Sequence, residues 1–207
     1  MNKVYVCLFD NMDSLDKNFF TDNLYRLPKF RQEQCAQYRQ KTDKRNCVLA
    51  YLLLEQGLWE QYSIMTPISF KYNEHGKPYL SNIPNIFFNI SHCKSGVVCA
   101  LADFEIGVDI QDIQPFDIRI AQEVCSEKEL QQLADSDNSL RLFYKIWTEK
   151  ESYAKAKGVS VAEVIKQELP PSGFSYIEST DYFLTIYSGR KDIKISNCTF
   201  AFPAILR

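Results

Sequence analysis

The pattern of apolar and polar positions divides the chain into two rounds of strands and helices that meet near residue 105. In the first round, short apolar runs predict strands at residues 4–9, 68–72, 86–90 and 96–102. Residues 30–62 have a helical pattern that fits one long helix or two, basic in the first part and apolar in the second.

The second round opens with an apolar stretch at residues 106–110 and then becomes mainly helical. Ser126 and Glu129 have the spacing of a helix N-terminal capping box. A long helix is expected to begin at Asn138 or Ser139 and to run through Lys157, with Gly158 directly after its end, where glycine commonly terminates helices.

The chain is expected to close with two strands, at residues 182–188 and 193–202, joined as a hairpin across Gly189. Two such rounds without a low-complexity linker predict an α+β fold of two similar halves, residues 1–105 and 106–207, packed together. A doubly wound nucleotide-binding sheet is less favoured, because the strands are expected to be mostly antiparallel and no G-x-G-x-x-G or Walker pattern occurs.

The most informative segment is FYKIWTEKESYAKAKG, residues 143–158. Drawn as a helix at 100° per residue, it has one arc of about 140° that holds Trp147, Lys150, Glu151, Ala154 and Lys155. An ordinary amphipathic helix keeps its charges away from the apolar face. This helix therefore either pairs its charges internally or lines a charged cleft.

Composition restricts the classes of function. The formal net charge of −2 argues against a general nucleic-acid binder or a membrane-surface binder, although it permits a local basic pocket. The longest apolar run, residues 48–54, is far shorter than the roughly 18 residues of a membrane span. The N-terminal sequence MNKVYVCLFDN meets Asp10 after a short apolar stretch, which predicts a strand and not a secretory signal.

The seven cysteines are an odd number, and none of them form a C-x-x-C pair. Most stand in apolar surroundings. Reduced, buried thiols in a cytoplasmic protein are the expectation.

Asp109 interrupts the apolar stretch IGVDI, where an unpaired carboxylate is costly to bury. In a strand, Asp109 and Gln111 face the same side, about 7 Å apart. The acid therefore needs a cation, a metal or a hydrogen-bond cluster. A structural alternative is an aspartate at the sheet end that caps a loop or pairs with an arginine.

Glu151 could supply a second carboxylate to the same cation, which would suit Mg²⁺. Lys150 and Lys155 beside a metal carboxylate would suit a highly charged anion such as a pyrophosphate. The structural alternative is an exposed salt bridge from Glu151 to Lys155, four residues apart.

His92, at the end of a strand beside Ser91, could donate to a phosphate or serve as a structural hydrogen-bonding residue. The basic residues between positions 29 and 45 could be a solvated helix face, and Lys77 could be an exposed turn residue.

Four motifs follow one another in order: Gly76-Lys77-Pro78, Phe88-Asn89-Ile90-Ser91-His92, Ile106-Gly107-Val108-Asp109, and Trp147-x-x-Lys150-Glu151-Ser152-x-x-Lys155. In order and spacing they resemble those of the 4′-phosphopantetheinyl transferases of the surfactin-synthetase-activating type, over roughly residues 1–200. The resemblance implies a pseudo-twofold pair of α+β halves with coenzyme A bound at their junction. It implies transfer of the phosphopantetheine arm to a serine of an apo acyl or peptidyl carrier protein, with release of adenosine 3′,5′-bisphosphate.

The resemblance also implies roles for individual residues. Asp109 and Glu151 would bind Mg²⁺, and Glu151 or a nearby metal-bound water would help to deprotonate the acceptor serine. Lys155, with Lys150 beside it, and His92 would hold the pyrophosphate. The 3′-phosphate of coenzyme A would contact Ser91, Lys77, Arg45 and, with the weakest motif match, Arg31.

Gln111 is a departure, because many members of this type have an acid at the corresponding position. A neutral amide oxygen can still bind Mg²⁺, directly or through water, so weaker metal binding is expected. The resemblance suggests residues 114–133 as the surface that docks the carrier, although this stretch could equally be a helix packed on its own core. The protein is expected to be a monomer.

Two other functions remain possible from the sequence. A metal-dependent hydrolase of nucleotide pyrophosphates would use Asp109 and Glu151 with water as the nucleophile. A module that binds coenzyme A or a carrier without turnover is the second, and Gln111 is the only residue that favours it.

Overall fold

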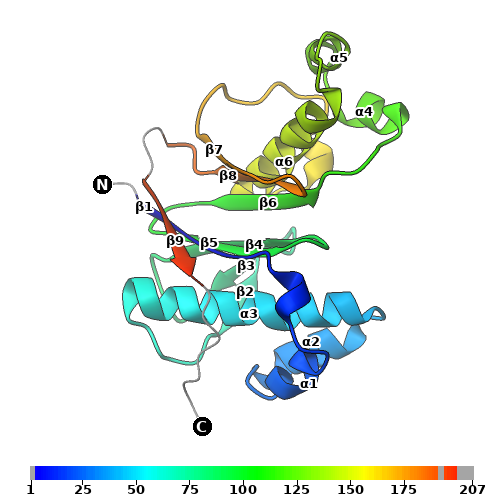
Figure 1. The fold of residues 1–207 in the computed structure, drawn as a ribbon. Helices are drawn as coiled ribbons and strands as arrows, with labels where there is room; N and C mark the ends of the chain where they lie inside the picture. Colours follow the sequence, from blue (N-terminus) through cyan, green and yellow to red (C-terminus); the bar gives the residue numbers. More distant parts are fainter. Residues whose placement is uncertain (1–2, 191–193, 200–207) are drawn as a thin grey trace.

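The computed structural model describes residues 3–190 and 194–199. Four layers follow one another in space: a long helix, a four-stranded sheet, a three-stranded sheet and a second long helix (Figure 1). The four-stranded sheet has the order β4 (Phe87–His92), β5 (Val97–Ala102), β1 (Lys3–Phe9) and β9 (Lys194–Thr199). The three-stranded sheet has the order β6 (Gly107–Asp112), β8 (Tyr182–Tyr187) and β7 (Phe174–Glu178).

The helices lie on the outer faces of the two sheets. Helix α3 (Lys41–Tyr62) covers the four-stranded sheet, and α6 (Ser139–Lys157) covers the three-stranded sheet (Figure 1). The remaining elements are η1 (Met12–Ser14), α1 (Phe19–Leu24), α2 (Lys29–Gln37), β2 (Phe70–Tyr72), β3 (Pro78–Leu80), α4 (Ile118–Val124), α5 (Glu127–Ala134) and η2 (Val161–Glu163).

Each half combines antiparallel strands with one long helix, which confirms the predicted α+β fold of two similar halves. Strands at the four positions predicted in the first half, the capping box before α5, and the end of α6 at Gly158 in the left-handed region agree with the sequence patterns. Strands β3 and β7 were not predicted, and β4 extends beyond its predicted end to His92. The pattern over residues 30–62 corresponds to two helices, because the backbone is extended at Tyr38 and Gln40.

The predicted hairpin across Gly189 is wrong. Strand β8 pairs antiparallel with β6 on one side and with β7 on the other, so neither edge of β8 is open to the next strand. Strand β9 instead runs parallel to β1 at the edge of the four-stranded sheet. Residue 193 and residues 200–202 of the expected strand lie outside the described residues.

Apolar side chains explain the layering. One buried cluster joins α3 to its sheet, with Leu49, Leu53 and Leu101 fully buried. A second cluster fills the space between the two sheets, where strand alternation points Val6 from β1 and Ile110 from β6 toward each other's sheet. The halves therefore pack through a shared apolar layer, and polar side chains cluster at its edge.

Gly107 allows α6 to lie directly on β6. A Cβ atom at this position would overlap the carbonyl oxygen of Ser152 and the backbone of Ala156. The glycine before Asp109 in the IGVD motif therefore sets the distance between the strand and the helix that hold the candidate site.

A disulfide joins Cys35 of α2 to Cys47 of α3. The expectation of reduced thiols is therefore wrong for this pair, because the two helices place both sulfur atoms against each other inside the core. Cys93 and Cys125 have free thiols. In the part of the chain that the structure describes, no helix combines the length and the apolar character needed to cross a membrane.

Candidate functional site

The two halves meet where β4 approaches β6. Side chains of β4 take the place of a second strand's backbone: Asn89 Oδ1 accepts from the Val108 amide at 2.9 Å, and Ser91 Oγ accepts from the Ile110 amide at 3.4 Å. Neither buried amide of β6 is left unsatisfied on this side, and Asp109 is held between the two contacts.

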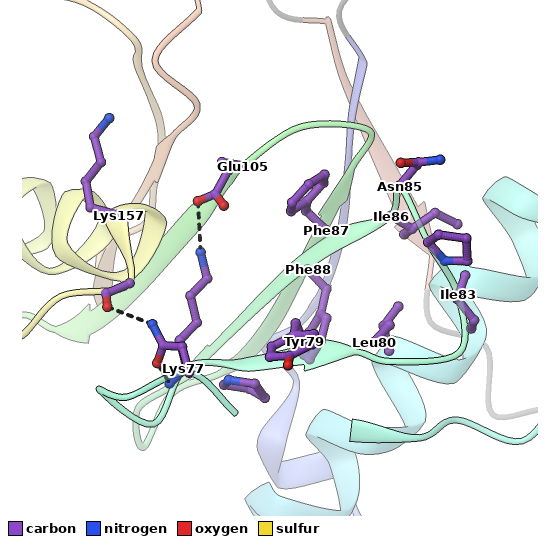
Figure 2. A pocket seen from close by; sticks show the side chains of 14 residues that line it. Lys77, Tyr79, Leu80, Ile83, Asn85, Ile86, Phe87, Phe88, Glu105 and Lys157 are labelled. Atoms are coloured by element: carbon purple, nitrogen blue, oxygen red, sulfur yellow. Dashed lines mark hydrogen bonds and ion pairs between the residues drawn. The ribbon is translucent and has the colours of Figure 1, made fainter. Parts of the chain in front are cut away.

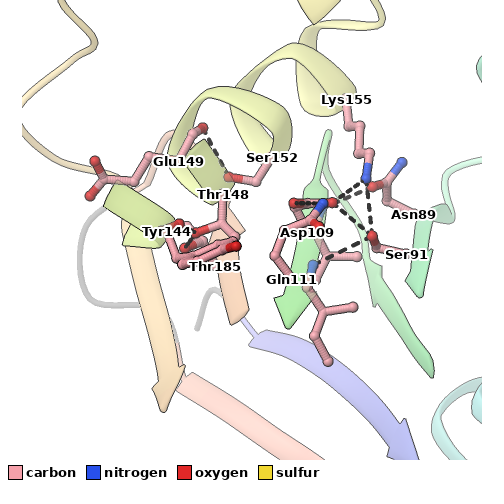
Figure 3. A network of polar contacts seen from close by, with 12 residues as sticks. Asn89, Ser91, Asp109, Gln111, Tyr144, Thr148, Glu149, Ser152, Lys155 and Thr185 are labelled. Carbon is pink, nitrogen blue, oxygen red and sulfur yellow. Dashed lines mark hydrogen bonds and ion pairs between the residues drawn. The ribbon is translucent and has the colours of Figure 1, made fainter. Parts of the chain in front are cut away.

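Asp109 is the centre of a polar network at this junction (Figure 3). Only 1% of the residue is exposed, and its Oδ1 accepts from Ser91 Oγ at 2.7 Å and from Lys155 Nζ at 2.5 Å. Gln111 Nε2 donates to the other carboxylate oxygen at 3.1 Å, as expected for two residues on one face of a strand. Lys155 Nζ also donates to Ser91 Oγ at 3.1 Å. The buried acid thus accepts three hydrogen bonds, one of them from a cation.

Glu151 lies one helical turn before Lys155 on α6 and is half-buried. Burial raises the pKa of its carboxyl, Lys155 lowers it, and the negative charge of Asp109 raises it further. The two carboxylates are therefore near enough to affect each other's ionisation. The ion pair of Lys155 within the described residues is with Asp109, so the alternative of an exposed bridge to Glu151 is not what holds this lysine.

Lys150 does not join this network, which corrects the expectation that it lies beside Lys155. Its side chain is fully buried, and Nζ lies 3.0 Å from Glu129 Oε2 of α5 and donates to the Gln167 carbonyl at 2.8 Å. On the helix, positions 150 and 155 are about 140° apart. Lys155, at one end of the predicted arc, therefore faces the junction of the halves, and Lys150, at the other end, faces α5.

His92 is the last residue of β4, and its side chain is reached by solvent. Crowding by neighbouring atoms lowers the pKa of its imidazole, and the positive charge of Lys155 lowers it further, whereas Asp43 and Asp109 raise it. His92 therefore lies between the Asp109 network and the first turn of α3, which contains Asp43.

Arg31 of α2 and Arg45 of α3 have buried Nε atoms without a hydrogen-bond partner. Arg31 Nη1 donates to Gln34 at 2.5 Å, its guanidinium lies 5.8 Å from the Phe70 ring centroid, and burial lowers its pKa. Buried donors without acceptors are costly. Both guanidinium groups therefore have hydrogen-bonding capacity that an anion could use.

Lys77 connects the turn between β2 and β3 to the C-terminal end of α6 (Figure 2). Its Nζ donates to the Ala156 carbonyl at 2.8 Å and lies 3.4 Å from Glu105, while Asn73 Nδ2 donates to the Gly158 carbonyl at 2.9 Å. Burial lowers the pKa of Lys77 and Glu105 raises it. In this structure, the ammonium therefore binds the helix C-terminus instead of lying open to a phosphate.

Residues 105–197 match the family model of the 4′-phosphopantetheinyl transferase superfamily, and residues 16–103 match a model described as 4′-phosphopantetheinyl transferase, N-terminal. A 4′-phosphopantetheinyl transferase of Bacillus subtilis is 30% identical over 178 residues, which covers 81% of this chain and 80% of that protein. This chain belongs to the 4′-phosphopantetheinyl transferase superfamily. The resemblance seen in the four motifs is confirmed.

Two other members of the superfamily show similar likeness. The 4′-phosphopantetheinyl transferase Sfp of Bacillus subtilis strain 168 is 32% identical over 148 residues, 70% of this chain and 63% of Sfp. The 4′-phosphopantetheinyl transferase gsp of Aneurinibacillus migulanus is 34% identical over 150 residues, 70% of this chain and 62% of gsp. The chain thus spans slightly less than two thirds of the length of these two transferases.

The side chains around Asp109 offer oxygen atoms of the kind that bind Mg²⁺. No three His, Cys, Asp or Glu side chains gather as a metal-binding group among the described residues. Asp109 and Glu151 supply two carboxylate oxygen donors, and these carboxylates are near enough to affect each other's ionisation. The Gln111 amide oxygen is a third donor. Such a small set fits Mg²⁺, which commonly takes one or two carboxylates and completes its shell with water and substrate phosphate.

Two surface pockets of the described residues lie apart from the network, because neither lining includes Ser91, Asp109 or Lys155. A pocket of about 320 Å³ includes Lys77, Tyr79, Phe87, Glu105 and Lys157 in its lining. A pocket of about 290 Å³ beyond the end of β6 is lined by Gln114, Pro115, Phe116, Asp117, Ile120, Phe143, Tyr144 and Trp147. Sequence reasoning had not predicted the first pocket, which requires β3, β4 and the end of α6 to come together.

Sequence reasoning also missed the role of Asn89. Its signal was present, because Asn89 and Ser91 alternate on one face of a strand whose other residues are mostly apolar. Two polar residues at such positions indicate a polar contact across that face, although not its partner.

Proposed function

We propose that this protein transfers the 4′-phosphopantetheine arm of coenzyme A to a serine of an apo acyl or peptidyl carrier protein. The observation that carries the proposal is the Asp109–Lys155–Ser91 network at the junction of the halves, with the Glu151 carboxyl in its field. The names of the similar transferases support the same reaction class.

The reaction asks the protein mainly for positioning and charge stabilisation. The serine oxygen forms a bond to the phosphorus that bears the pantetheine arm. The bond from that phosphorus to the bridging oxygen breaks, and adenosine 3′,5′-bisphosphate leaves. The nucleophile belongs to the carrier, so the chain needs no catalytic serine or cysteine of its own.

Glu151, or a metal-bound water near it, receives the serine proton in this proposal. Lys155 and His92 bind the pyrophosphate oxygens, and Lys155 stabilises the charge that develops on the leaving bisphosphate. Asp109 orients Lys155 through their 2.5 Å contact.

Mg²⁺, bound by Asp109, Glu151 and Gln111, would supply neutralisation of the pyrophosphate charge. Gln111 Nε2 donates to Asp109 in this structure, so Oε1 is its atom for the metal or a metal-bound water.

Arg31, Arg45, Lys77 and Ser91 are proposed to hold the 3′-phosphate of coenzyme A. The orphaned Nε atoms of Arg31 and Arg45 support this assignment. Lys77 would first have to leave the Ala156 carbonyl, and Ser91 is engaged by Asp109, so these two assignments have weaker support.

The carrier is proposed to dock on residues 114–133. Ile118 and Ile120 are 57% and 50% exposed there, and Phe116 lines the 290 Å³ pocket at the end of β6. Exposed apolar residues beside an aromatic pocket suit an apolar contact. The division at residue 105, the cytoplasmic location and the monomeric state stay predictions.

Mass spectrometry of apo acyl and peptidyl carriers incubated with this protein, coenzyme A and Mg²⁺ tests the proposal. We expect a mass gain equal to one phosphopantetheine arm on the carrier serine. Steady release of adenosine bisphosphate from coenzyme A without any carrier would instead identify a hydrolase. Binding of coenzyme A without either product would identify a module without turnover.

A further inference from the structure

The helix that holds Glu151 has a buried lysine on another face. Lys150, the residue directly before Glu151, is 0% exposed. Its Nζ lies 3.0 Å from Glu129 Oε2 and 2.8 Å from the Gln167 carbonyl oxygen. Lysine is rarely buried completely unless its charge is paired, and here the partner comes from a separate element, α5.

Glu129 holds two elements at once. The oxygen that faces Lys150, Oε2, also accepts from the Ser126 amide at 2.7 Å and closes the capping box at the start of α5. The glutamate therefore fixes the first turn of α5 and joins it to α6. A shift of α5 along α6 would break the contact with Lys150, because the capping box holds this carboxylate at the first turn of α5.

Helices α4 and α5, with the segment that leads into them from residue 114, form a lobe that we call the docking lobe. A small apolar cluster joins it to α6 through residues such as Val124, Leu133 and Phe143. Besides Lys150–Glu129, the Lys166 amide donates to the Val124 carbonyl at 2.8 Å. The lobe thus rests on α6 through a modest core and the Lys150–Glu129 contact, and on the segment after α6 through the Lys166 amide.

Stability alone gives a weak reason for this ion pair. Desolvation of two charges offsets much of their attraction, and buried pairs can often be replaced by apolar residues without loss of stability. An ion pair with satisfied hydrogen bonds is, however, directional, whereas apolar contacts permit sliding. The geometry therefore favours a role in orientation.

We propose that Lys150 and Glu129 are positioning residues that hold the docking lobe in register with Glu151. This inference rests on the proposed function and deepens it: the pair sets how well the carrier serine is presented, and Lys150 does not contact coenzyme A. Lys150 and Glu151 are consecutive on a rigid helix, so the anchor of the lobe and the reacting centre move as one body.

The test uses Lys150→Met, Glu129→Gln and the double variant, with Lys145→Met as the matched control on the exposed side of the same helix. Kd for coenzyme A is measured calorimetrically without carrier, KM and kcat are measured with carrier, and Tm is measured for each protein. We expect Lys150→Met to raise the carrier KM by about tenfold or more, because misplacement of reacting groups is costly. The Kd for coenzyme A should change by less than about twofold, the range of an uninvolved residue.

The double variant separates orientation from stability. Without an unpaired buried charge it should regain most of the Tm lost by Lys150→Met, yet keep the raised carrier KM. If KM returns to the wild-type value together with Tm, the pair only stabilises the fold and the inference is overturned. A clearly weaker Kd for coenzyme A in Lys150→Met would also overturn it, because the lysine would then contact the coenzyme.

Failure of the proposed function would look different. The wild-type protein would then bind coenzyme A and modify no carrier. In that case hydrogen exchange tests whether the Lys150–Glu129 pair anchors the docking lobe to α6. In the double variant, amides of α4 and α5 should exchange faster than in the wild type, while those of β6 should exchange at an unchanged rate. Equal exchange in the lobe of both proteins would refute the anchor.

Discussion

Asp109 shows how much a single residue can reveal before the structure is known. An acid inside an apolar strand must have a partner, and strand alternation places Gln111 on its side. The structure agrees, with Lys155 and Gln111 both bonded to the carboxylate. The prediction that Lys150 lies beside Lys155 was wrong, because the pattern of one helix does not show which of its residues contact a neighbouring helix. The partner of Lys150, Glu129, lies 21 positions earlier in the chain.

Gln111→Glu tests the metal set at the residue scale. A second acid beside Asp109 adds one negative charge, so Mg²⁺ should bind more tightly, with the half-saturating concentration for transfer lowered by about threefold or more. The measurement is a Mg²⁺ titration of the transfer rate, with Gln114→Glu as a control on the docking segment. An unchanged midpoint in Gln111→Glu would contradict the assignment of Gln111 to the metal.

His92 gives a pH dependence. Its pKa lies below the ordinary value of 6.5, so the free protein holds the imidazole mostly neutral at neutral pH. A bound pyrophosphate would raise this pKa, so coenzyme A binding should take up a proton and strengthen as pH falls between the two values. Calorimetry in buffers of different ionisation enthalpy measures the uptake. His92→Asn should lose this part of it, and an identical uptake in the variant would contradict the contact.

At the scale of elements, the chain shows which features a local pattern can predict. Most strands and α6 follow from periodicity, whereas the short β3 and the edge strand β7 do not, and Gly158 follows from helix termination. Strand pairing does not, because β8 pairs with β6 and with β7, the strand directly before it, whereas β9 pairs with β1. The close contact of β6 with α6 at Gly107 was likewise not predicted. The glycine makes room for the helix, but a glycine in a strand does not by itself show that a helix lies on it.

The disulfide between α2 and α3 predicts a redox effect on stability. Its cysteines are 12 positions apart, and a loop of this size contributes about 3 kcal/mol in the loop-entropy account. Urea unfolding with a reductant should therefore show a free energy of unfolding lower by about 2–3 kcal/mol. The Cys35→Ala/Cys47→Ala variant should not respond to the reductant. An equal response in variant and wild type would place the effect at another cysteine.

At the scale of the whole molecule, neither half holds the candidate site alone. Ser91 and His92 come from the last residues of β4, and Asp109, Glu151 and Lys155 come from the second half. Four motifs in order identified the family from sequence, but their convergence required the two sheets to pack face to face. Strand β9, near the end of the second half, adds to the sheet of the first half and joins the halves again.

The central claim is that Asp109 and Glu151 act as one unit in the transfer of the phosphopantetheine arm. The most direct measurement is the rate of arm transfer for Asp109→Ala, Glu151→Ala and the double variant, each confirmed to be folded. We predict that each single change lowers turnover by at least ~10²-fold and that the double variant is little worse than the slower single one, because residues of one unit are not additive. Losses that multiply in the double variant, or a near wild-type rate for Glu151→Ala, would contradict the account.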